Sequence, residues 1–574
     1  MSAADTSHSA PNLSIPPDGK VSLHGNPPAL RPAAYLARPG TPHLAIFLCA
    51  YVLLGLVGHD PWKADEPYSF GLIHSILKNG DWVVPTLVGE PFMEKPPLYY
   101  LSAAAFAWLL SPPLTLHDAA RLASGLYVAL TLWFVALSAR AAWGRGARLA
   151  AVLALIGCLG LIGTAHEIMT DVALLAGFAI AYYGLGIGSM RPLAGGLALG
   201  VGAGVGFMSK GLVALGMIGS IAVFLPLLFR DWRVRAYLQT SMVAAFALAP
   251  WLLIWPWALY LRSPQLFMDW FWLNNLGRYL GFAGLGADAH PWFYTDTLWW
   301  FAWPAWPLAL WTLWRRRAKG HASLRLPLLS VAAIMGILTL SASARALYAL
   351  PVLVPLAVLA AGACDEIPAR VAAVLDWASR LFWAGCTLLV WAAWLALIAR
   401  SPLQLPILAK YLPSAFEAQF QLLPLVTALL LAFAWVAAMR GLARTGLRAV
   451  ASWAFGITLC WGTINTLWLP WMDAAKSYRA VYVSMRRALP PAFGCIATHG
   501  VGESERAMLE YFIGMVPRRM ATEAGASCTL LLLQDGAADG GVGPGSGWRV
   551  IWQGGRLGDP NERHRLFMRD AKGG

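Results

Sequence analysis

The segment FMEKPPLYYLSAAAFAWLLS, residues 92–111, decides how this chain is threaded through a membrane. Its second part, residues 98–111, is an apolar run with a Pro-Pro pair on each side. A helix needs about 20 apolar residues to cross a hydrocarbon core of about 30 Å. Because this run is shorter, we expect an interfacial or re-entrant helix here and not a full span.

The rest of the chain has the composition of a membrane protein. Hydrophobic residues make up 58% of its 574 residues, charged residues only 13%, and the mean hydropathy is +0.57. Apolar stretches of roughly 16 to 24 residues recur, which is about the length of a membrane-spanning helix. Residues 1–41 differ: they are polar and Pro-rich and contain no signal-peptide pattern, so we expect a disordered cytoplasmic tail.

We expect about thirteen transmembrane helices. The ranges are 43–58, 118–139, 149–164, 172–188, 193–208, 212–229, 237–260, 294–314, 326–341, 346–362, 378–399, 422–439 and 450–469.

Charge asymmetry between the connections supports this count. With the N-terminus inside and 98–111 not spanning, seventeen basic residues fall on the cytoplasmic side: Arg140, Arg145, Arg148, Arg191, Arg230, Arg233, Arg235, Arg315, Arg316, Arg317, Lys319, Arg325, Arg370, Arg380, Arg440, Arg444 and Arg448. The opposite connections hold only six: Lys210, Arg262, Arg278, Arg345, Arg400 and Lys410. Counting 98–111 as a span would reverse the two sides, against the positive-inside rule. The net charge of +14 is therefore a topology signal and does not indicate nucleic-acid binding.

This topology divides the chain into a membrane domain, 42–469, and a C-terminal domain, 470–574, on the outer side. The membrane domain has two large outer connections, 59–117 and 261–293. In the tail, FGCIA, CTLLLLQ and WRVIWQ have the pattern of buried strands, and ESERAMLEYFIG that of an amphipathic helix. We therefore expect a small periplasmic α/β domain. An outer location would permit a Cys495–Cys528 disulfide, and the sequence leaves its formation open.

Ionisable residues outside the cytoplasmic clusters gather on the outer side. They are Asp60, Asp65, Glu66, Glu94, Lys95, His166, Glu167, Asp171, Lys210, Arg278, His290 and Arg345. Acids and cations that recur on one face of five connections indicate an outer-leaflet cavity. No Cys/His spacing indicates a metal site, and neither histidine is assigned as a ligand.

Each of these residues also has a structural alternative. Asp65 and Glu66 are suited to capping a helix through PYSFGLIHSILKNG, with Pro67 in the first turn and Gly80 near the end. Asp171 is placed to be the N-cap of its span. Glu94 and Lys95 would form a weak solvated pair if exposed. Lys210 and Arg278 would snorkel to lipid headgroups.

The motifs, taken together, resemble a known family. ADEPYSFGLIHSILKNGDWVVPTLVGEPFMEKPPLYY is similar to the first periplasmic loop of GT-C glycosyltransferases related to the 4-amino-4-deoxy-L-arabinose (lipid A) transferase and to protein O-mannosyltransferases. In the same order follow a TD pair at 170–171, SKG at 209–211, Arg278-Tyr279, and an S…R…Y…LP stretch at 341–351. The resemblance covers roughly residues 43–365 and is most specific in the first loop.

The resemblance implies a role for each site residue. It implies catalytic roles for Asp65, Asp171 and Glu66, and donor-phosphate binding by Lys95, Arg278, Lys210 and Arg345. It implies substrate binding by Glu94, Tyr348, Tyr68 and Tyr279. A carboxylate, with Asp65 as first choice, would activate the acceptor, while cations stabilise the departing phosphate.

The function implied is an inverting glycosyltransferase of the bacterial inner membrane whose active site faces the periplasm. Its donor would be a sugar on a polyprenyl (undecaprenyl) phosphate, and its acceptor lipid A or another cell-envelope glycolipid or glycan. The alternatives are a protein O-mannosyltransferase-like enzyme, a lipid-linked glycan ligase and a lipid transporter. The resemblance assigns no certain cofactor, and the sequence leaves a divalent cation open.

Three positions depart from the family pattern. Tyr68-Ser69 stands where the family usually has Arg-Tyr, Arg345 where it often has Lys, and Asn274-Asn275 where it often has acidic or His residues. These changes keep the reaction class but leave the sugar and the acceptor open.

Overall fold

The structure is a computed structural model. It describes residues 42–286, 290–317, 321–364, 366–399, 416, 419–441, 445–535, 544–559 and 562–570. The expected disordered tail, 1–41, lies outside the described residues, as do Lys319, Arg400, Lys410 and Arg444 of the charge count.

The described part of the membrane region is almost entirely helical. Its elements are α1 (Pro42–Leu53), α2 (Glu66–Asn79), β1 (Thr86–Leu87), β2 (Glu90–Pro91), α3 (Leu98–Leu110), α4 (Leu116–Trp143), α5 (Ala147–Ile156), α6 (Leu159–Ile162), η1 (Thr164–His166), α7 (Thr170–Ile187), α8 (Pro192–Lys210), α9 (Leu212–Leu228), η2 (Arg230–Trp232), α10 (Arg235–Arg262), α11 (Pro264–Met268), η3 (Asp269–Gly277), α12 (Arg278–Leu280), α13 (Phe293–Phe301), α14 (Ala305–Arg316), η5 (Ala322–Leu324), α15 (Arg325–Thr339), η6 (Ala346–Val352), α16 (Leu353–Ala361), α17 (Ala369–Ile398), α19 (Leu422–Gly441), α20 (Gly446–Thr463) and η7 (Ile464–Trp468).

The chain is a multi-pass helical membrane protein, as the sequence predicts. Among the described residues, eight helical segments are long and apolar enough to cross a membrane, and a ninth span exists if α5 and the bent segment after it are counted together. The sequence-based count of thirteen is higher because it includes shorter or broken apolar helices. Residues 98–110 form a helix, α3, of 13 residues that packs on α2 and α4.

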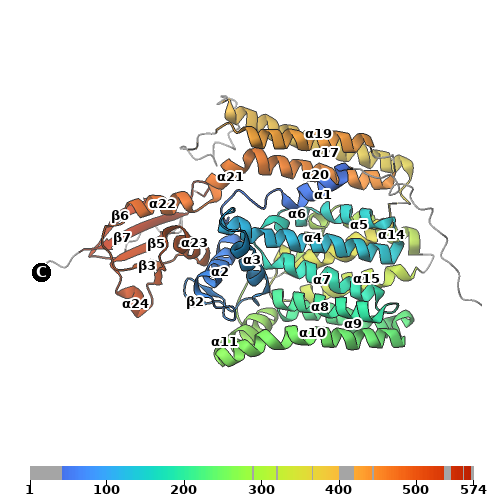
Figure 1. Cartoon of the computed structure of the whole chain (residues 1–574), viewed down its shortest axis with the longest axis horizontal. Helices are drawn as coiled ribbons and strands as arrows, with labels where there is room; N and C mark the ends of the chain where they lie inside the picture. Colours follow the sequence, from blue (N-terminus) through green and yellow to red (C-terminus); the bar gives the residue numbers. More distant parts are fainter. Residues whose placement is uncertain are drawn as a thin grey trace, which may run out of the picture. The chain divides into compact units, whose positions relative to one another are not determined.

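The closest packing in the membrane region is between α7 and α8, which lie side by side with α4 and α10 in Figure 1. Glycines on the facing sides bring the two backbones together. A Cβ at Gly202 would lie 2.4 Å from the backbone nitrogen of Ala181, and one at Gly184 would lie 2.5 Å from that of Leu199. Small residues permit such contacts between membrane helices, where dispersion between close backbones replaces the hydrophobic effect.

This packing fixes the position of two charged side chains. Because α7 and α8 are connected by a short turn, the first residues of α7 lie beside the last residues of α8. Asp171 is in the first turn of α7, and Lys210 is the last residue of α8. The glycine contact therefore brings an acid and a cation together from positions 39 residues apart in the sequence.

The first outer connection contains α2, with the boundaries that its residues predict. Pro67 lies in the first turn, where its missing N–H costs nothing, and Gly80 ends the helix in the left-handed conformation with φ 69°. One face of α2 packs on a helix of the C-terminal tail, α23 (Glu503–Ile513). Gly71 makes this contact close, since a Cβ there would lie 2.6 Å from that of Ala507.

The tail contains the strands and the helix that the sequence predicts. Its elements are α21 (Leu469–Lys476), α22 (Arg479–Arg487), β3 (Ile496–His499), α23, β4 (Arg518–Arg519), α24 (Glu523–Ala526), β5 (Leu530–Asp535), β6 (Trp548–Gly554) and β7 (Arg563–Arg569). The strands form one sheet in the order β4-β3-β5-β7-β6, in which β3 is parallel to β4 and β5, and β7 is antiparallel to β5 and β6. A disulfide joins Cys495, before β3, to Cys528, before β5.

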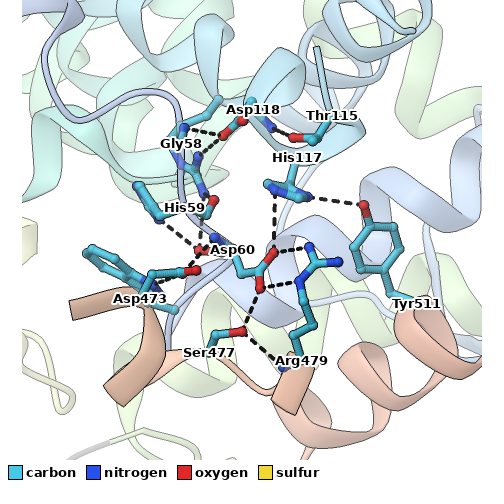
Figure 2. A network of polar contacts seen from close by, with 12 residues as sticks. Gly58, His59, Asp60, Thr115, His117, Asp118, Asp473, Ser477, Arg479 and Tyr511 are labelled. Carbon is cyan, nitrogen blue, oxygen red and sulfur yellow. Dashed lines mark hydrogen bonds and ion pairs between the residues drawn. The ribbon is translucent and has the colours of Figure 1, made fainter. Parts of the chain in front are cut away.

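A buried polar network joins the tail to the first outer connection (Figure 2). The Asp60 carboxylate accepts hydrogen bonds from Ser477 Oγ at 2.6 Å and from the Arg479 guanidinium, whose Nε lies at 2.8 Å. In return, Asp473 accepts from the Asp60 backbone N–H and from Trp62 Nε1, both at 2.9 Å. Burial alone would raise the pKa of Asp60, but the bonds from Arg479 and Ser477 outweigh it, so the pKa lies below its usual value. The carboxylate therefore stays ionised and holds the start of the tail.

We predict that Gly202→Ala destabilises the protein, because the added methyl group would overlap backbone atoms of α7. Overpacking of this kind costs about 1–3 kcal/mol. Thermal unfolding in detergent should show a lower midpoint for this variant. Gly219→Ala in α9 is the matched control, since no atom lies within 4 Å of a Cβ there, and its midpoint should not fall. Equal midpoints for the two variants would contradict the packing account.

Candidate active site

Asp65 is placed at the start of α2 but does not cap it. It occupies the N-cap position, yet its side chain makes no capping hydrogen bond. Oδ2 instead accepts from Arg345 Nη2 at 2.8 Å, across 280 residues of sequence. Arg345 stands directly before η6, on the fifth outer connection. The helix-cap alternative for Asp65 is therefore wrong, and its carboxylate contacts one of the predicted phosphate-binding cations.

Glu66, the next residue, has a different environment from that expected of a catalytic acid. It is 1% exposed, and its Oε1 accepts from Arg121 Nε and from the Ile168 backbone N–H, both at 2.9 Å. Oε2 accepts from the Trp62 backbone N–H at 3.0 Å. A buried carboxylate with this set of donors is fully satisfied. These bonds hold Glu66 in the first turn of α2, next to Asp65, and its catalytic role stays a prediction.

The EKPP motif brings an acid and two cations together. Arg278 Nη1 donates to Glu94 Oε1 at 2.7 Å, and Lys95 Nζ lies 3.9 Å from the same oxygen. Lys95 is 7% exposed and donates to Tyr68 Oη at 2.9 Å. Glu94 and Lys95 are therefore not the weak, solvated pair of the structural alternative, since Lys95 is buried. Arg278 does not snorkel to lipid headgroups, because a protein carboxylate holds it.

A second pair lies beside the first. Lys210 Nζ donates to both oxygens of Asp171, at 2.7 and 2.8 Å, and lies 4.5 Å from the centre of the Tyr348 ring. The N-cap of α7 is Met169, so Asp171 is not the cap, and its 2% exposed side chain is committed to Lys210. Arg345 is an electrostatic neighbour of Asp171, which connects this pair to Asp65.

A nine-residue π-helix, η3, supplies the remaining wall. Its wider turns let Asn275 Nδ2 donate to the Trp270 carbonyl five residues earlier, at 2.8 Å, while Asn275 Oδ1 accepts from the Leu212 backbone N–H at 3.0 Å. Single π-type turns are frequent at functional sites. Directly after η3 come Arg278 and Tyr279, and the Tyr279 hydroxyl donates to the Ile337 carbonyl at 2.9 Å.

These segments enclose a small cavity. It measures about 70 Å³, and the following residues line it: Glu94, Lys95, Leu174, Lys210, Val213, Met217, Asn274, Asn275, Arg278, Tyr279, Leu338, Ser341, Ser343 and Tyr348. Six of the eleven predicted site residues are in this lining. Asp171 and Tyr68 each hydrogen-bond a lining lysine, Asp65 and Arg345 pair with each other, and Glu66 lies apart.

The site contains more cations than carboxylates. Four cations, Lys95, Lys210, Arg278 and Arg345, share three carboxylates, those of Asp65, Glu94 and Asp171. Burial alone would raise the pKa of Glu94, but the neighbouring Lys95 and Arg278 lower it to about 2. Glu94 is therefore an anion at every physiological pH, and the site keeps a net positive charge that suits a phosphate.

The sequence reading missed two residues of this region. Arg121 is 0% exposed, and it lies within a predicted span, where a charged residue is by default a functional or structural signal. Glu167 was noted in the sequence but given no role. Burial, and then the nearby carboxylates of Glu66 and Asp65, raise the pKa of Glu167 to about 8. Its charge state therefore changes near neutral pH.

The described residues contain no group of three or more His, Cys, Asp or Glu side chains arranged to hold a metal ion. The carboxylates of the site contact cations of the protein itself.

The chain is similar in sequence to known transferases. No family model matches the chain. It is 28% identical over 329 residues to an undecaprenyl phosphate-alpha-4-amino-4-deoxy-L-arabinose arabinosyl transferase of Pseudomonas fluorescens, which covers 55% of this chain and 56% of that protein. It is 30% identical over 387 residues to the enzyme of the same name from Aeromonas salmonicida, covering 62% and 66%. The matched region thus spans less than two thirds of these relatives.

Solved structures show the fold. The crystal structure of ArnT from Cupriavidus metallidurans bound to undecaprenyl phosphate superposes with a TM-score of 0.65 at 18% identity, covering 94% of this chain and 99% of that one. The apo structure of the same protein gives the same score. The resemblance seen in the sequence is confirmed, and the chain has the ArnT fold.

We predict that Glu167 makes stability fall as the pH rises. The unfolded chain releases this proton near the ordinary value of 4.5, whereas the folded protein keeps it up to about 8. The folded state therefore loses stability between these values and not outside them. Unfolding midpoints of wild type and Glu167→Gln, measured from pH 4 to 9, should diverge across this window. The exposed Glu523→Gln is the control, and a constant difference for Glu167→Gln would contradict the prediction.

Proposed function

We propose that the chain is an inverting membrane glycosyltransferase that moves a sugar from a polyprenyl phosphate to an extracytoplasmic acceptor. One observation carries the proposal: Lys95, Lys210 and Arg278, from three separate segments, converge on one cavity bordered by carboxylates. The relatives are named as transferases that use undecaprenyl phosphate-linked aminoarabinose. The ArnT fold supports the same class of reaction.

The proposed enzyme has thirteen spans and an active site that faces the periplasm. Beyond the eight or nine helices that are long enough, four expected ranges fall on shorter apolar segments: α1, α9, the α13–α14 pair and the η6–α16 pair. The connections at the other ends of these spans carry most of the basic residues, which favours a cytoplasmic location for those ends. The disulfide between Cys495 and Cys528 suits a tail in an oxidising compartment. An inner-membrane location follows from this topology.

Donor binding would begin with the phosphate. Lys95 and Arg278 both contact Glu94 Oε1, so the carboxylate stands where a phosphate oxygen would bind. A phosphate that binds both cations takes over these contacts, and Glu94 moves away. A cavity of about 70 Å³ is small beside the ~300–1,000 Å³ of ordinary ligand sites. Displacement of Glu94 would therefore enlarge the site as well as free the cations.

Chemistry would follow as a single displacement. The acceptor oxygen forms a bond to the anomeric carbon while the bond from that carbon to the phosphate oxygen breaks, and the electron pair of the broken bond stays on the phosphate. Asp65 takes the proton of the acceptor hydroxyl. Lys95 and Arg278 stabilise the negative charge on the departing phosphate in a site with little water. Asp171 acts by orienting Lys210, and Tyr348 covers the Lys210 ammonium.

The proposed acceptor is lipid A or another glycolipid of the cell envelope. Its hydroxyl or phosphate must reach Asp65 from the side opposite to the donor phosphate, because the displacement inverts the anomeric carbon.

Replacing Asp65 tests the proposed base. Asp65→Asn keeps the shape of the side chain but removes its basicity, and transfer in membranes supplied with a polyprenyl-phosphate sugar should fall by about 100-fold or more. Binding of the donor should be little changed. Asp231→Asn is the control, since Asp231 is an exposed acid on the cytoplasmic side of the proposed topology. Near-normal transfer by Asp65→Asn would remove Asp65 from the mechanism.

Replacing Lys95 tests the phosphate site. A hydrogen bond to a charged group contributes about 1.5–3 kcal/mol, so Lys95→Ala should weaken binding of undecaprenyl phosphate by roughly 10-fold or more. Lys78→Ala, at the exposed end of α2, should leave binding unchanged. Glu94→Gln should have the opposite effect and tighten binding, because the competing anion is gone. Unchanged affinity in both Lys95→Ala and Glu94→Gln would contradict the assignment.

A further inference from the structure

A second, larger cavity lies between the first outer connection and the tail. It measures about 470 Å³ and is lined in part by Lys63, Trp471, Met472, Lys476, Arg556 and Asp559. Three segments form its walls: the residues just before α2, the helix α21, and the connection from β6 to β7. The backbone N–H of Gly558 donates to the carbonyl of Ala475 at 3.0 Å, which fastens that connection to α21. This volume is in the range of ordinary ligand sites.

The cations of this cavity differ in their partners. Lys63 Nζ lies 2.6 Å from Glu505 Oε1, and Arg556 Nε donates to Glu562 Oε2 at 2.8 Å, so both are neutralised by acids of the tail. Lys476 makes no hydrogen bond or ion pair within the described part of the chain. Its ammonium lies over the Trp62 ring, 4.6 Å from the ring centre. The cavity therefore presents one cation that is available to a ligand.

The position of Lys476 is fixed by the network of Figure 2. Asp473 and Ser477, on either side of it, hydrogen-bond the first outer connection through Asp60 and Trp62. These bonds hold α21 and the Trp62 ring in place relative to each other. The backbone of Lys476 is thus fixed, and its exposed side chain places the ammonium over the Trp62 ring.

This cavity is connected to the proposed active site through the carboxylates. Lys63 and Ala64 line it, and the next residue is Asp65, which pairs with Arg345 on the donor side. Lys476 and Asp65 both act electrostatically on the Glu167 carboxyl group. The proposed base thus follows directly in the sequence on two residues of this cavity and pairs with a cation of the proposed donor site. An acceptor that approaches Asp65 from the side away from the donor phosphate would come from here.

Apart from Lys476, the wall contributed by α21 is apolar. Trp471 and Met472 pack in a cluster with Trp394, Leu425 and Trp468, which belong to the hydrophobic helices α17 and α19 and to η7. The apolar lining therefore continues toward the membrane-spanning helices, while the cation is at the level of the tail. A ligand matched to this wall has an acyl chain and an anionic headgroup.

We propose that this cavity is the acceptor site and that Lys476 binds a phosphate of a phosphorylated amphiphile. The inference rests on the proposed function and deepens it, since it assigns the second substrate a place and a recognition residue. The hydrocarbon part of the acceptor lies against Trp471 and Met472, and the reacting group reaches Asp65. No residue of the donor cavity takes part in this recognition.

The test is binding of acceptor without turnover, using full-length protein in nanodiscs. The probes are phosphorylated lipid A, dephosphorylated lipid A and phosphatidylglycerol. Lys476→Gln should weaken binding of phosphorylated lipid A about tenfold relative to wild type, and Lys476→Arg should restore it. Lys78→Gln, another exposed lysine, should bind as wild type does. Dephosphorylated lipid A should bind weakly to all four proteins.

Three results would overturn the inference. One is equal binding of phosphorylated lipid A by wild type and Lys476→Gln. Another is equally tight binding of the dephosphorylated form by wild type. The third is full displacement of lipid A by equimolar phosphatidylglycerol, which would make the site one for phospholipid headgroups. Affinity for undecaprenyl phosphate, measured in the same samples, should be unchanged in Lys476→Gln. Failure of the proposed function itself would appear separately, as no sugar transfer by wild-type protein supplied with a polyprenyl-phosphate sugar.

Discussion

The backbone contact between α7 and α8 is the constraint on which the site depends. Glycines on both helices allow an approach that no side chain would permit, and this sets the acidic start of one helix against the basic end of the other. The Asp171–Lys210 pair is buried at that junction, where an unpaired charge would cost several kcal/mol. The packing of these two helices therefore places a pair of opposite charges at their adjoining ends.

The other charged residues of the site are paired in the same way. Each proposed phosphate-binding cation lies beside a carboxylate, which for Lys210, Arg278 and Arg345 comes from another segment, so the site is internally balanced apart from one positive charge. Such a site is ordered without exposing several unpaired cations, and in the proposed mechanism an anion binds by taking over their carboxylate contacts. Glu66 and Arg121 are both buried and bond each other at the start of α2, next to Asp65.

Much of this site could be predicted from the sequence because its residues lie in short motifs at membrane boundaries. Lys95, Lys210 and Arg278 were found in this way, and they do converge. The burial of Glu66 could not be predicted, because neighbouring residues at a helix start point about 100° apart, so one can be buried while the other pairs with a different segment. The span count was limited by short and broken helices, and the pairing of Arg121 and the cavity beside Lys476 depend on contacts between segments more than 50 residues apart in the sequence.

The location of the donor phosphate tests the account most directly. A cryo-electron microscopy structure of the protein with undecaprenyl phosphate would show it. The account predicts phosphate oxygens within hydrogen-bond distance of Lys95 and Arg278, with Glu94 no longer in contact with Arg278. A phosphate bound elsewhere, with the Glu94–Arg278 pair intact, would contradict it.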